Sequence, residues 1–314
     1  MALGRGVHSR PFRAGTRCRL AYVVGPAMTA SAASSIDDSS ATVPPKRMRA
    51  ILAYDGRPHS GWQFVGNGKS VQEAVERAVG RLLKIGRRVP VHSSGRTDAG
   101  VHALGQVVHF DVPATCRMDG GAWRRALNSL LPPSIRVLEV RPAEEGFHAR
   151  YSATGKHYRF HLFTGPILPP HEFGLVWQWP WPLDAEAMTA AAARFRGEHD
   201  FSAFAAFRHD GTDQDAGTGK NVRRVWRADV IANGPRLVFD FEGSGFLYRM
   251  VRMMVGALIH VGRGTLAASG IDLLLECRCK EDGRLIKSPL CADGDGLYLV
   301  EVFYETRPSA NIWA

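Results

Sequence analysis

The chain has 314 residues, enough for about two domain-sized units or one large unit with a substantial core. Its hydrophobic fraction of 45% and charged fraction of 22% are ordinary for a globular protein, and no apolar run approaches the roughly 18 residues that span a bilayer. These totals exclude a membrane-spanning protein, so we expect a soluble one. The formal net charge of +10 is compatible with a polyanionic partner, but residues 1–47 alone contribute +5 of it. Charge by itself therefore leaves nucleic-acid binding open.

Five cysteines are present, and their spacing shows no disulfide pattern, which fits a reducing compartment. Cys277 and Cys279, followed by Cys291, match no common zinc-binding spacing. We therefore expect free thiols and no metal.

Residues 1–47 lack hydrophobic periodicity and are predicted to be a disordered leader or a misassigned start. Their Arg-rich, acid-free beginning is typical of a mitochondrial transit peptide, but no long amphipathic helix is visible. We favour a misassigned start, with Met28 or Met48 as the initiator. The expected location is the cytoplasm, and a mitochondrial location is the alternative.

Regular patterns begin at Arg49, and Arg49–Tyr54 is predicted to be a strand that ends in an Asp-Gly turn. Ser70 and Glu73 form a capping box at the start of a helix, which Gly86 is expected to close. Gln106–Val112 alternates polar and apolar residues and is predicted to be a half-buried strand.

In the second half, residues 157–162 alternate His or Arg with Tyr, Phe and Leu, which predicts a strand with one basic face. Asp184 is expected to cap a helix that runs to Gly197. Further elements are predicted at residues 237–241 (strand), 246–261 (an apolar helix) and 297–305 (strand).

Strands interspersed with long helices predict an α+β fold with a mixed or antiparallel central sheet flanked by helices. The order of elements restarts near residue 150, which indicates two similar halves. We expect an N-terminal catalytic half, 48–150, and a C-terminal half, 151–314, that completes the active-site cleft.

The run Ser93–Ala103 carries the chemistry of the first half. Gly95 and Gly100 bracket a polar turn, and such a turn presents Arg96 and Asp98 at the edge of a sheet, where loops usually carry function. A carboxylate beside an arginine stays ionised and can act as a nucleophile or base. On residue types alone, a tight turn with a solvated Arg–Asp pair accounts for the pattern slightly better.

The eight consecutive residues Gly95-Arg96-Thr97-Asp98-Ala99-Gly100-Val101-His102 resemble the catalytic motif of the TruA family of tRNA pseudouridine synthases. Family-like segments follow the same order along the chain: Tyr54–Gly56, Gly61–Gln63, Ser70–Glu73, Gly105–Phe110, Phe147–Arg150, Lys156–Arg159, His199–Phe201, Met250–Gly256 and Gly296–Leu299. The resemblance covers roughly residues 49 to 304 and implies the pseudouridine synthase fold.

The resemblance implies an isomerase that converts uridine to pseudouridine in the anticodon stem-loop of tRNA, at positions 38 to 40. It also implies a homodimer that needs no cofactor and no metal. Asp98 matches the catalytic aspartate, which would attack the target uridine at the sugar carbon or at the base. Arg96 matches the arginine that fills the place of the flipped nucleotide.

Two more residues match the family's site. Tyr158 matches the tyrosine that stacks on the flipped base, although strand alternation alone favours an ordinary core tyrosine. Arg252 matches the arginine that pairs with Asp98. It lies in a helix that is apolar almost all round, where a buried guanidinium needs a carboxylate; without the resemblance, a surface arginine with a buried stem fits as well.

Other basic residues are candidates for phosphate contacts: His102, Arg150, His157, Arg159, Arg208, Lys220, Arg223, Arg224 and Arg249. Two alternative functions remain. One is a non-catalytic tRNA-binding or chaperone protein, and the other is a glycosidase that releases the base, because the carboxylate chemistry overlaps.

Overall fold

The computed structural model describes residues 44–66, 68–86, 88–206, 219–277 and 285–305. All of them belong to one compact unit of the chain, Val43–Ala314. Most of the expected leader, with Met28, lies outside the described residues. Lys46 and Arg47, which the sequence analysis assigned to that leader, are in fact the first residues of a strand.

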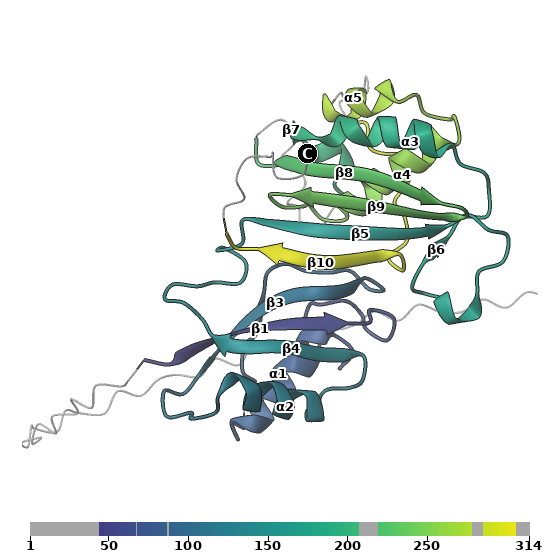
Figure 1. Cartoon of the computed structure of the whole chain (residues 1–314). Coiled ribbons are helices and arrows are strands. Elements are labelled where there is room, and N and C mark those ends of the chain that lie inside the picture. Colours follow the sequence, from purple (N-terminus) through teal and green to yellow (C-terminus); the bar gives the residue numbers. More distant parts are fainter. Residues whose placement is uncertain (1–43, 67, 87, 207–218, 278–284, 306–314) are drawn as a thin grey trace, which may run out of the picture. The chain divides into compact units, whose positions relative to one another are not determined.

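A mixed ten-stranded sheet runs through the described chain (Figure 1). Its long path runs in the order β4 (Ile135–Pro142), β1 (Lys46–Tyr54), β3 (His102–Val112), β10 (Leu297–Phe303), β5 (Gly155–Phe163), β9 (Arg236–Gly243), β8 (Val222–Asn233) and β7 (Gly197–Asp200). The short strands β2 (His92–Ser93) and β6 (Trp177–Gln178) pair with β3 and β5. The β10–β3 and β5–β6 pairs are parallel and the others antiparallel. The predicted α+β class with a mixed sheet is confirmed.

Helices lie in two groups, as Figure 1 shows. Near β1 and β4 are α1 (Val71–Leu82) and α2 (Gly120–Leu130). Near β8 and β9 are α3 (Ala185–Ala192), α4 (Met250–Gly262) and α5 (Ser269–Leu275). Single turns of 3-10 helix occur at Pro170–Glu172, Ala193–Phe195 and Ser202–Phe204. Within the described ranges, every helix is too short or too polar to cross a membrane.

The two faces of the sheet differ in character. Along β5, Tyr158, Phe160 and Leu162 are buried in the same core as the apolar side chains of α4. His157 and Arg159 alternate with them and therefore point to the opposite face. The predicted two-sided strand is confirmed, and its apolar side belongs to the core.

The predicted N-cap residues of two helices are confirmed. Ser70 Oγ accepts a hydrogen bond from Glu73 N at 3.3 Å, and Asp184 Oδ1 accepts one from Ala187 N at 2.9 Å. The predicted ends are wrong by several residues. Helix α1 ends at Leu82, before Gly86, because Lys84 takes a left-handed φ of 54°.

The two other predicted helices are also shorter than expected. Helix α3 ends at Ala192, and Gly197, with a φ of 110°, already belongs to β7. Helix α4 begins at Met250 instead of residue 246, because Arg249 holds a left-handed φ of 58° that no α-helix continues. This turn places residues 246–249 as an irregular segment in front of α4.

Candidate active site

All four residues predicted for the site line one cavity of about 1190 Å³. Arg96 and Asp98 come from the loop between β2 and β3, Tyr158 comes from β5, and Arg252 comes from the first turn of α4. The cavity therefore collects side chains that are far apart in the sequence. Its volume exceeds the roughly 300–1,000 Å³ that is usual for a single small-molecule ligand.

The loop that carries Asp98 is held by contacts from the end of β1 and the segment after it. The Tyr54 and Thr97 hydroxyls are hydrogen-bonded at 2.8 Å, and Trp62 N donates to Thr97 O at 3.0 Å. Gly61 has a φ of 93°, and a Cβ there would lie 2.8 Å from Thr97 O. Only glycine fits this close approach, which fixes the backbone next to Asp98 in advance of any substrate.

Asp98 is paired with Arg252 across the cavity wall. Arg252 Nη1 donates to Asp98 Oδ2 at 2.9 Å, and Arg252 Nε donates to Ala292 O at 2.6 Å. The Arg252 side chain is only 12% exposed and the Asp98 side chain 21%. Arg249 Nε lies 3.8 Å from the same carboxylate oxygen. Arg252 thus satisfies the need of a buried guanidinium for an anionic partner, and it orients the carboxylate.

The second carboxylate oxygen of Asp98, Oδ1, accepts no hydrogen bond from any residue in the part of the chain that the structure describes. Asp98 lines the cavity and keeps part of its side chain exposed, so one oxygen is held by Arg252 and the other has no hydrogen-bond donor among the described residues. The arrangement suits a nucleophile whose direction is set by a neighbour.

Tyr158 forms an aromatic wall of the cavity. Its ring meets Phe246 edge to face, with ring centroids 5.2 Å apart, and only 8% of the residue is exposed. Burial raises the pKa of the Tyr158 phenol far above its usual value, and the charges of Tyr54 and Asp98 act in the same direction. The phenol is therefore neutral at physiological pH and offers a π surface to a base. Arg96, in contrast, is exposed at the cavity rim.

Lys156 is a cavity residue that the sequence analysis missed. Its Nζ donates to Ser94 O at 3.0 Å, so β5 also supports the loop. Burial, together with the positive charges of Arg150 and Arg223, lowers the pKa of Lys156 to about 8. Lys156 stands two residues before Tyr158, and strand alternation could have placed both on one face.

Some of the predicted phosphate contacts lie at the cavity and others do not. Arg150, Arg223 and Arg249 line it. Lys220 and Arg224 are exposed but are not part of its lining. Arg208 lies outside the described residues.

His102 is not a phosphate ligand, and that prediction is wrong. The residue is 2% exposed, and its Nδ1 accepts from Gly56 N at 3.1 Å. Its Nε2 lies 2.9 Å from Gly174 O, and its ring stacks on Tyr298. These contacts tie the loop to its surroundings and leave the imidazole no surface for RNA.

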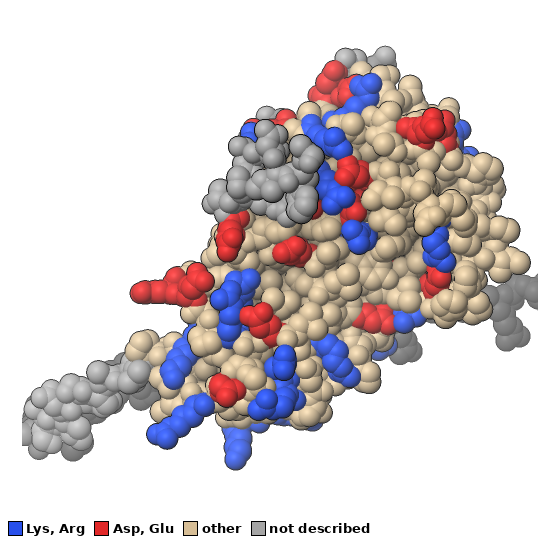
Figure 2. Space-filling model, viewed as in Figure 1, with Lys and Arg blue, Asp and Glu red and all other residues tan. Residues whose placement is uncertain are grey.

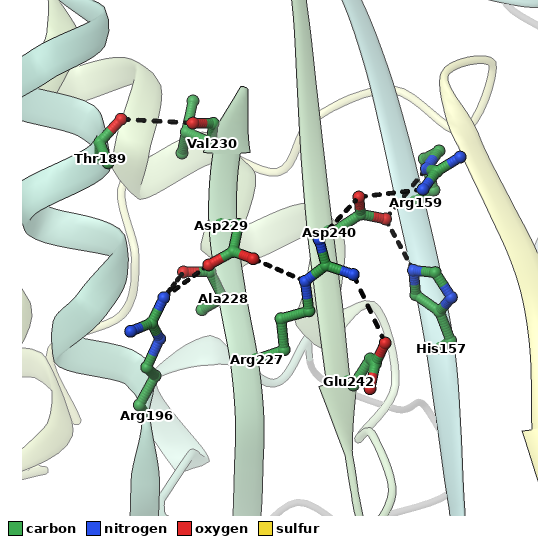
Figure 3. A network of polar contacts seen from close by, with 10 residues as sticks. All are labelled: His157, Arg159, Thr189, Arg196, Arg227, Ala228, Asp229, Val230, Asp240 and Glu242. Atoms are coloured by element: carbon green, nitrogen blue, oxygen red, sulfur yellow. Dashed lines mark hydrogen bonds and ion pairs between the residues drawn. The ribbon is translucent and has the colours of Figure 1, made fainter. Parts of the chain in front are cut away.

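His157 and Arg159, also candidates for phosphate contacts, do not line the cavity, because they belong to an ion-pair network on the opposite face of the sheet from Tyr158 (Figure 3). His157 Nε2 lies 2.6 Å from Asp240 Oδ1, and Arg159 donates to both oxygens of Asp240 at 2.9 and 3.0 Å. The network comprises His157, Arg159, Arg196, Arg227, Asp229, Asp240 and Glu242. Figure 2 shows acidic and basic side chains interleaved on the face in view, which is unlike a continuous basic track.

Asp240 is the centre of this network and is 0% exposed. Burial alone would raise the pKa of Asp240, but the hydrogen bonds from His157 and Arg159 and their charges outweigh it and lower the pKa to about 2. The carboxylate is therefore fully charged and fully used by its partners.

In the described ranges, no three or more His, Cys, Asp or Glu side chains are grouped as metal ligands. Cys116, Cys277 and Cys291 are free thiols, and Cys18 and Cys279 lie outside those ranges.

Comparison with known proteins agrees with this geometry. A sequence model of the family described as tRNA pseudouridine synthase matches residues 50–152 and 191–305. These ranges contain Asp98, Arg96 and Arg252, and the gap between them contains Tyr158.

Curated relatives named tRNA pseudouridine synthase A align with most of the chain. The protein of Akkermansia muciniphila is 43% identical over 258 residues, covering 82% of this chain and 95% of the relative. That of Geobacillus kaustophilus is 39% identical over 260 residues, covering 83% and 95%. That of Solidesulfovibrio magneticus is 42% identical over 266 residues, covering 82% and 91%. The chain therefore belongs to the tRNA pseudouridine synthase family.

Proposed function

We propose that this protein isomerises uridine to pseudouridine in tRNA, with Asp98 as the nucleophile, and that its targets are positions 38 to 40 of the anticodon stem-loop. The observation that carries the proposal is the Asp98–Arg252 hydrogen bond of 2.9 Å, formed in a cavity that Tyr158 also lines. A carboxylate, an orienting cation and an aromatic wall are the groups that such a reaction needs around one nucleotide.

In the proposed reaction the bond between the sugar C1′ and N1 of uracil breaks, the uracil rotates, and C1′ bonds to C5. The hydrogen on C5 leaves as a proton and N1 takes up a proton, so substrate and product are isomers and no oxidant or reductant is consumed. Asp98 attacks either the electron-poor sugar carbon or the base before the new C1′–C5 bond forms, and the bond to Asp98 then breaks, which regenerates the carboxylate. Oδ1 is the oxygen that makes this attack, since Oδ2 is held by Arg252.

The other predicted residues have roles that follow from their positions. Tyr158 stacks on the extruded base with its neutral ring. Arg252 keeps the carboxylate aimed. Arg96, exposed on the rim, enters the stem where the target nucleotide has left and offsets part of the cost of extrusion, which is a few kcal/mol.

The decisive experiment measures tritium release from tRNA labelled at uridine C5. The wild-type protein should release tritium, and Asp98→Asn should lower the rate by at least about 10⁴-fold, the order of loss that follows removal of a nucleophile. Asp111→Asn is the matched control: Asp111 also pairs with an arginine, Arg47, but it does not line the cavity. This control should keep full activity.

Chromatography of the digested product separates the alternatives. Pseudouridine in the tRNA supports the isomerase, whereas free uracil supports a glycosidase. A wild-type protein that binds tRNA and releases no tritium is the non-catalytic binding protein, and equal activity of Asp98→Asn removes Asp98 from the mechanism.

We also propose that the protein works as a homodimer in the cytoplasm, with one tRNA bridging both subunits. Light scattering on the purified protein measures the first point, and a monomer with full activity would contradict it. A fluorescent fusion that keeps residues 1–47 tests the second, with mitochondrial import as the alternative outcome.

A further inference from the structure

Beside Asp98 the cavity is bordered by a short loop, residues 147–152, whose backbone is held at every step. His148 N donates to Ser152 Oγ at 2.9 Å, and Ser152 N donates to His148 O at 2.9 Å. The amides of Arg150 and Tyr151 both donate to His148 Nδ1, at 3.1 and 3.3 Å. Ala149 N donates to His109 Nδ1 at 3.1 Å. The loop is therefore built to hold one shape.

This rigid loop presents an aromatic side chain to the solvent. Tyr151 is 77% exposed and lines the cavity. Its ring lies on His148 with centroids 4.3 Å apart, and His148 meets His109 at 4.5 Å. His92 stacks on His109 at 4.9 Å, with the two planes 19° apart. The four rings form a chain of contacts, here called the aromatic stack, in which the His148–His109 contact is edge to face and Tyr151 is the outer end.

The middle of the stack is uncharged. A ring nitrogen that accepts a hydrogen bond carries a lone pair, so His109 and His148, which both accept through Nδ1, are neutral imidazoles. Burial, the charge of Arg47 and the neighbouring imidazole His148 lower the pKa of His109 to about 4, in agreement with this. Neutral rings suit stacking on an uncharged base, and a phosphate would not select them.

Cationic groups accompany the stack on the same cavity wall. Arg150 follows His148 by two residues, with its guanidinium carbon 5.8 Å from the Tyr151 ring. Arg223 and Lys156 line the cavity as well. Aromatic faces with interleaved positive charges are the pattern of single-stranded nucleic-acid binding, in which bases stack and the backbone is neutralised.

We propose that Tyr151 and His148 form a second base-stacking subsite, which binds an unpaired nucleotide near the target uridine in the same RNA. This inference rests on the proposed function, because the RNA that carries the target supplies the second base. The cavity is larger than one ligand requires, and Tyr158 and Tyr151 both line it. The stack takes any base, so it fixes the register of the RNA without reading a sequence.

The first test compares Tyr151→Ala and Tyr151→Phe in the tritium-release assay. Because stacking on one aromatic ring contributes about 1–3 kcal/mol, Tyr151→Ala should raise KM for tRNA about tenfold or more, with kcat much less affected. Tyr151→Phe should restore KM, since it keeps the ring. Phe173→Ala is the matched control, because Phe173 is 74% exposed and lies outside the cavity lining; it should behave as wild type.

The second test measures stacking directly and does not depend on turnover. In the Asp98→Asn background, tRNA transcripts carry the fluorescent base 2-aminopurine at one loop nucleotide at a time. At one or two nucleotides, binding should quench the fluorescence, and Tyr151→Ala should remove this quenching while Tyr151→Phe keeps it. Tyr151→Ala should leave the salt dependence of tRNA binding unchanged. Arg150→Ala should reduce the slope of log binding constant against log salt concentration by about one.

Two results would overturn the subsite. One is a Tyr151→Ala variant with the KM of the wild type; the other is that removing the Tyr151 ring changes the quenching at none of the labelled nucleotides. Either result leaves the role of Asp98 intact. Conversely, if the wild-type protein releases no tritium but quenching still depends on Tyr151, the proposed isomerase activity is refuted and the subsite is kept.

Discussion

The molecule holds two carboxylates with arginine partners on opposite faces of one sheet, and they differ in what they leave unused. Asp240 accepts hydrogen bonds from Arg159 on both of its oxygens, contacts His157, and is fully buried. Asp98 pairs with Arg252 through Oδ2 alone and keeps 21% of its side chain exposed.

This difference separates a structural ion pair from one that is suited to take part in a reaction. A carboxylate whose oxygens are both hydrogen-bonded to neighbours stabilises the fold and is not available for reaction. A carboxylate held by one oxygen on a supported loop is aimed but still available. The arginine partner does not distinguish the two sites; the free oxygen and the open cavity do.

Among the variants that test this contrast between the two carboxylates, the largest effect should come from replacing Arg252, the cation of the Asp98–Arg252 pair. Arg252→Leu should lower kcat by about 10³-fold, because an oriented charged group at a reacting centre contributes on the order of 10²–10³. Tritium release under saturating tRNA measures kcat. Arg252→Lys keeps the charge and should recover part of the rate.

Circular dichroism distinguishes this chemical loss from a loss of fold, since Arg252 Nε also binds Ala292 O. A folded Arg252→Leu protein with wild-type kcat would show that the cation does not aim Asp98, and the contrast between the two carboxylates would lose its basis.

Replacing Asp240, on the other face of the sheet, should lower the stability of the fold and leave the rate of the reaction unchanged. Asp240→Ala removes a fully buried anion that three basic side chains share and should lower the free energy of unfolding by about 3–5 kcal/mol, because His157 and the partly exposed Arg159 and Arg227 then lie together without it. Asp98→Ala should lower it by less, about 1–3 kcal/mol, because Arg252 loses its carboxylate but keeps its hydrogen bond to Ala292 O. Urea unfolding monitored by fluorescence measures both.

Asp229→Ala is the control for Asp240→Ala. Asp229 lies in the same network and is 29% exposed, so its loss should cost about 1 kcal/mol or less. If Asp98→Ala destabilised the protein as much as Asp240→Ala, the first carboxylate would be structural too.

The smallest effect concerns a buried group that is held without charge, His109. Its pKa is lowered to about 4 by burial and by neighbouring positive charge, whereas an unfolded histidine titrates near pH 6.5. Between these values the unfolded chain binds more protons than the native one, so stability is lost as the pH falls from 6.5 towards 4.

His109→Asn removes this titration and keeps an acceptor for Ala149 N. The stability advantage of the wild type over His109→Asn should shrink by roughly 1 kcal/mol between pH 7.5 and pH 5.5, since one pKa unit is worth about 1.4 kcal/mol. Urea unfolding at several pH values tests this, and a pH-independent difference would mean that His109 has the same pKa in the folded and the unfolded chain.

Local signals predicted the parts of the fold that they control. The caps at Ser70 and Asp184 are visible because one side chain bonds one nearby amide. Helix α2 was not predicted, and its signal is weak: only Trp123 and Leu127 are buried. The parallel pairing of β10 with β3 joins residues far apart in the chain, and no local pattern encodes it.

The site, too, has features that the sequence predicts and features that only the fold creates. The motif around Asp98 and the off-stripe position of Arg252 are readable in the sequence, but the two residues are 154 positions apart and only the fold brings them into contact. The basic face of β5 was misjudged because its partner, Asp240, lies on another strand. A lone aspartate between Phe239 and Phe241 was the available signal that a buried cation must lie opposite it.

The parallel contact between β10 and β3 also sets the order in which the molecule can assemble. Tyr298 pairs with His102 next to the Asp98 loop, and β10, which joins β3 to β5, follows every other strand of the described sheet along the chain. It therefore leaves the ribosome after them, and contacts of such long sequence separation form slowly. A nascent chain thus carries the motif around Asp98 for most of the synthesis of this sheet before the cleft can assemble.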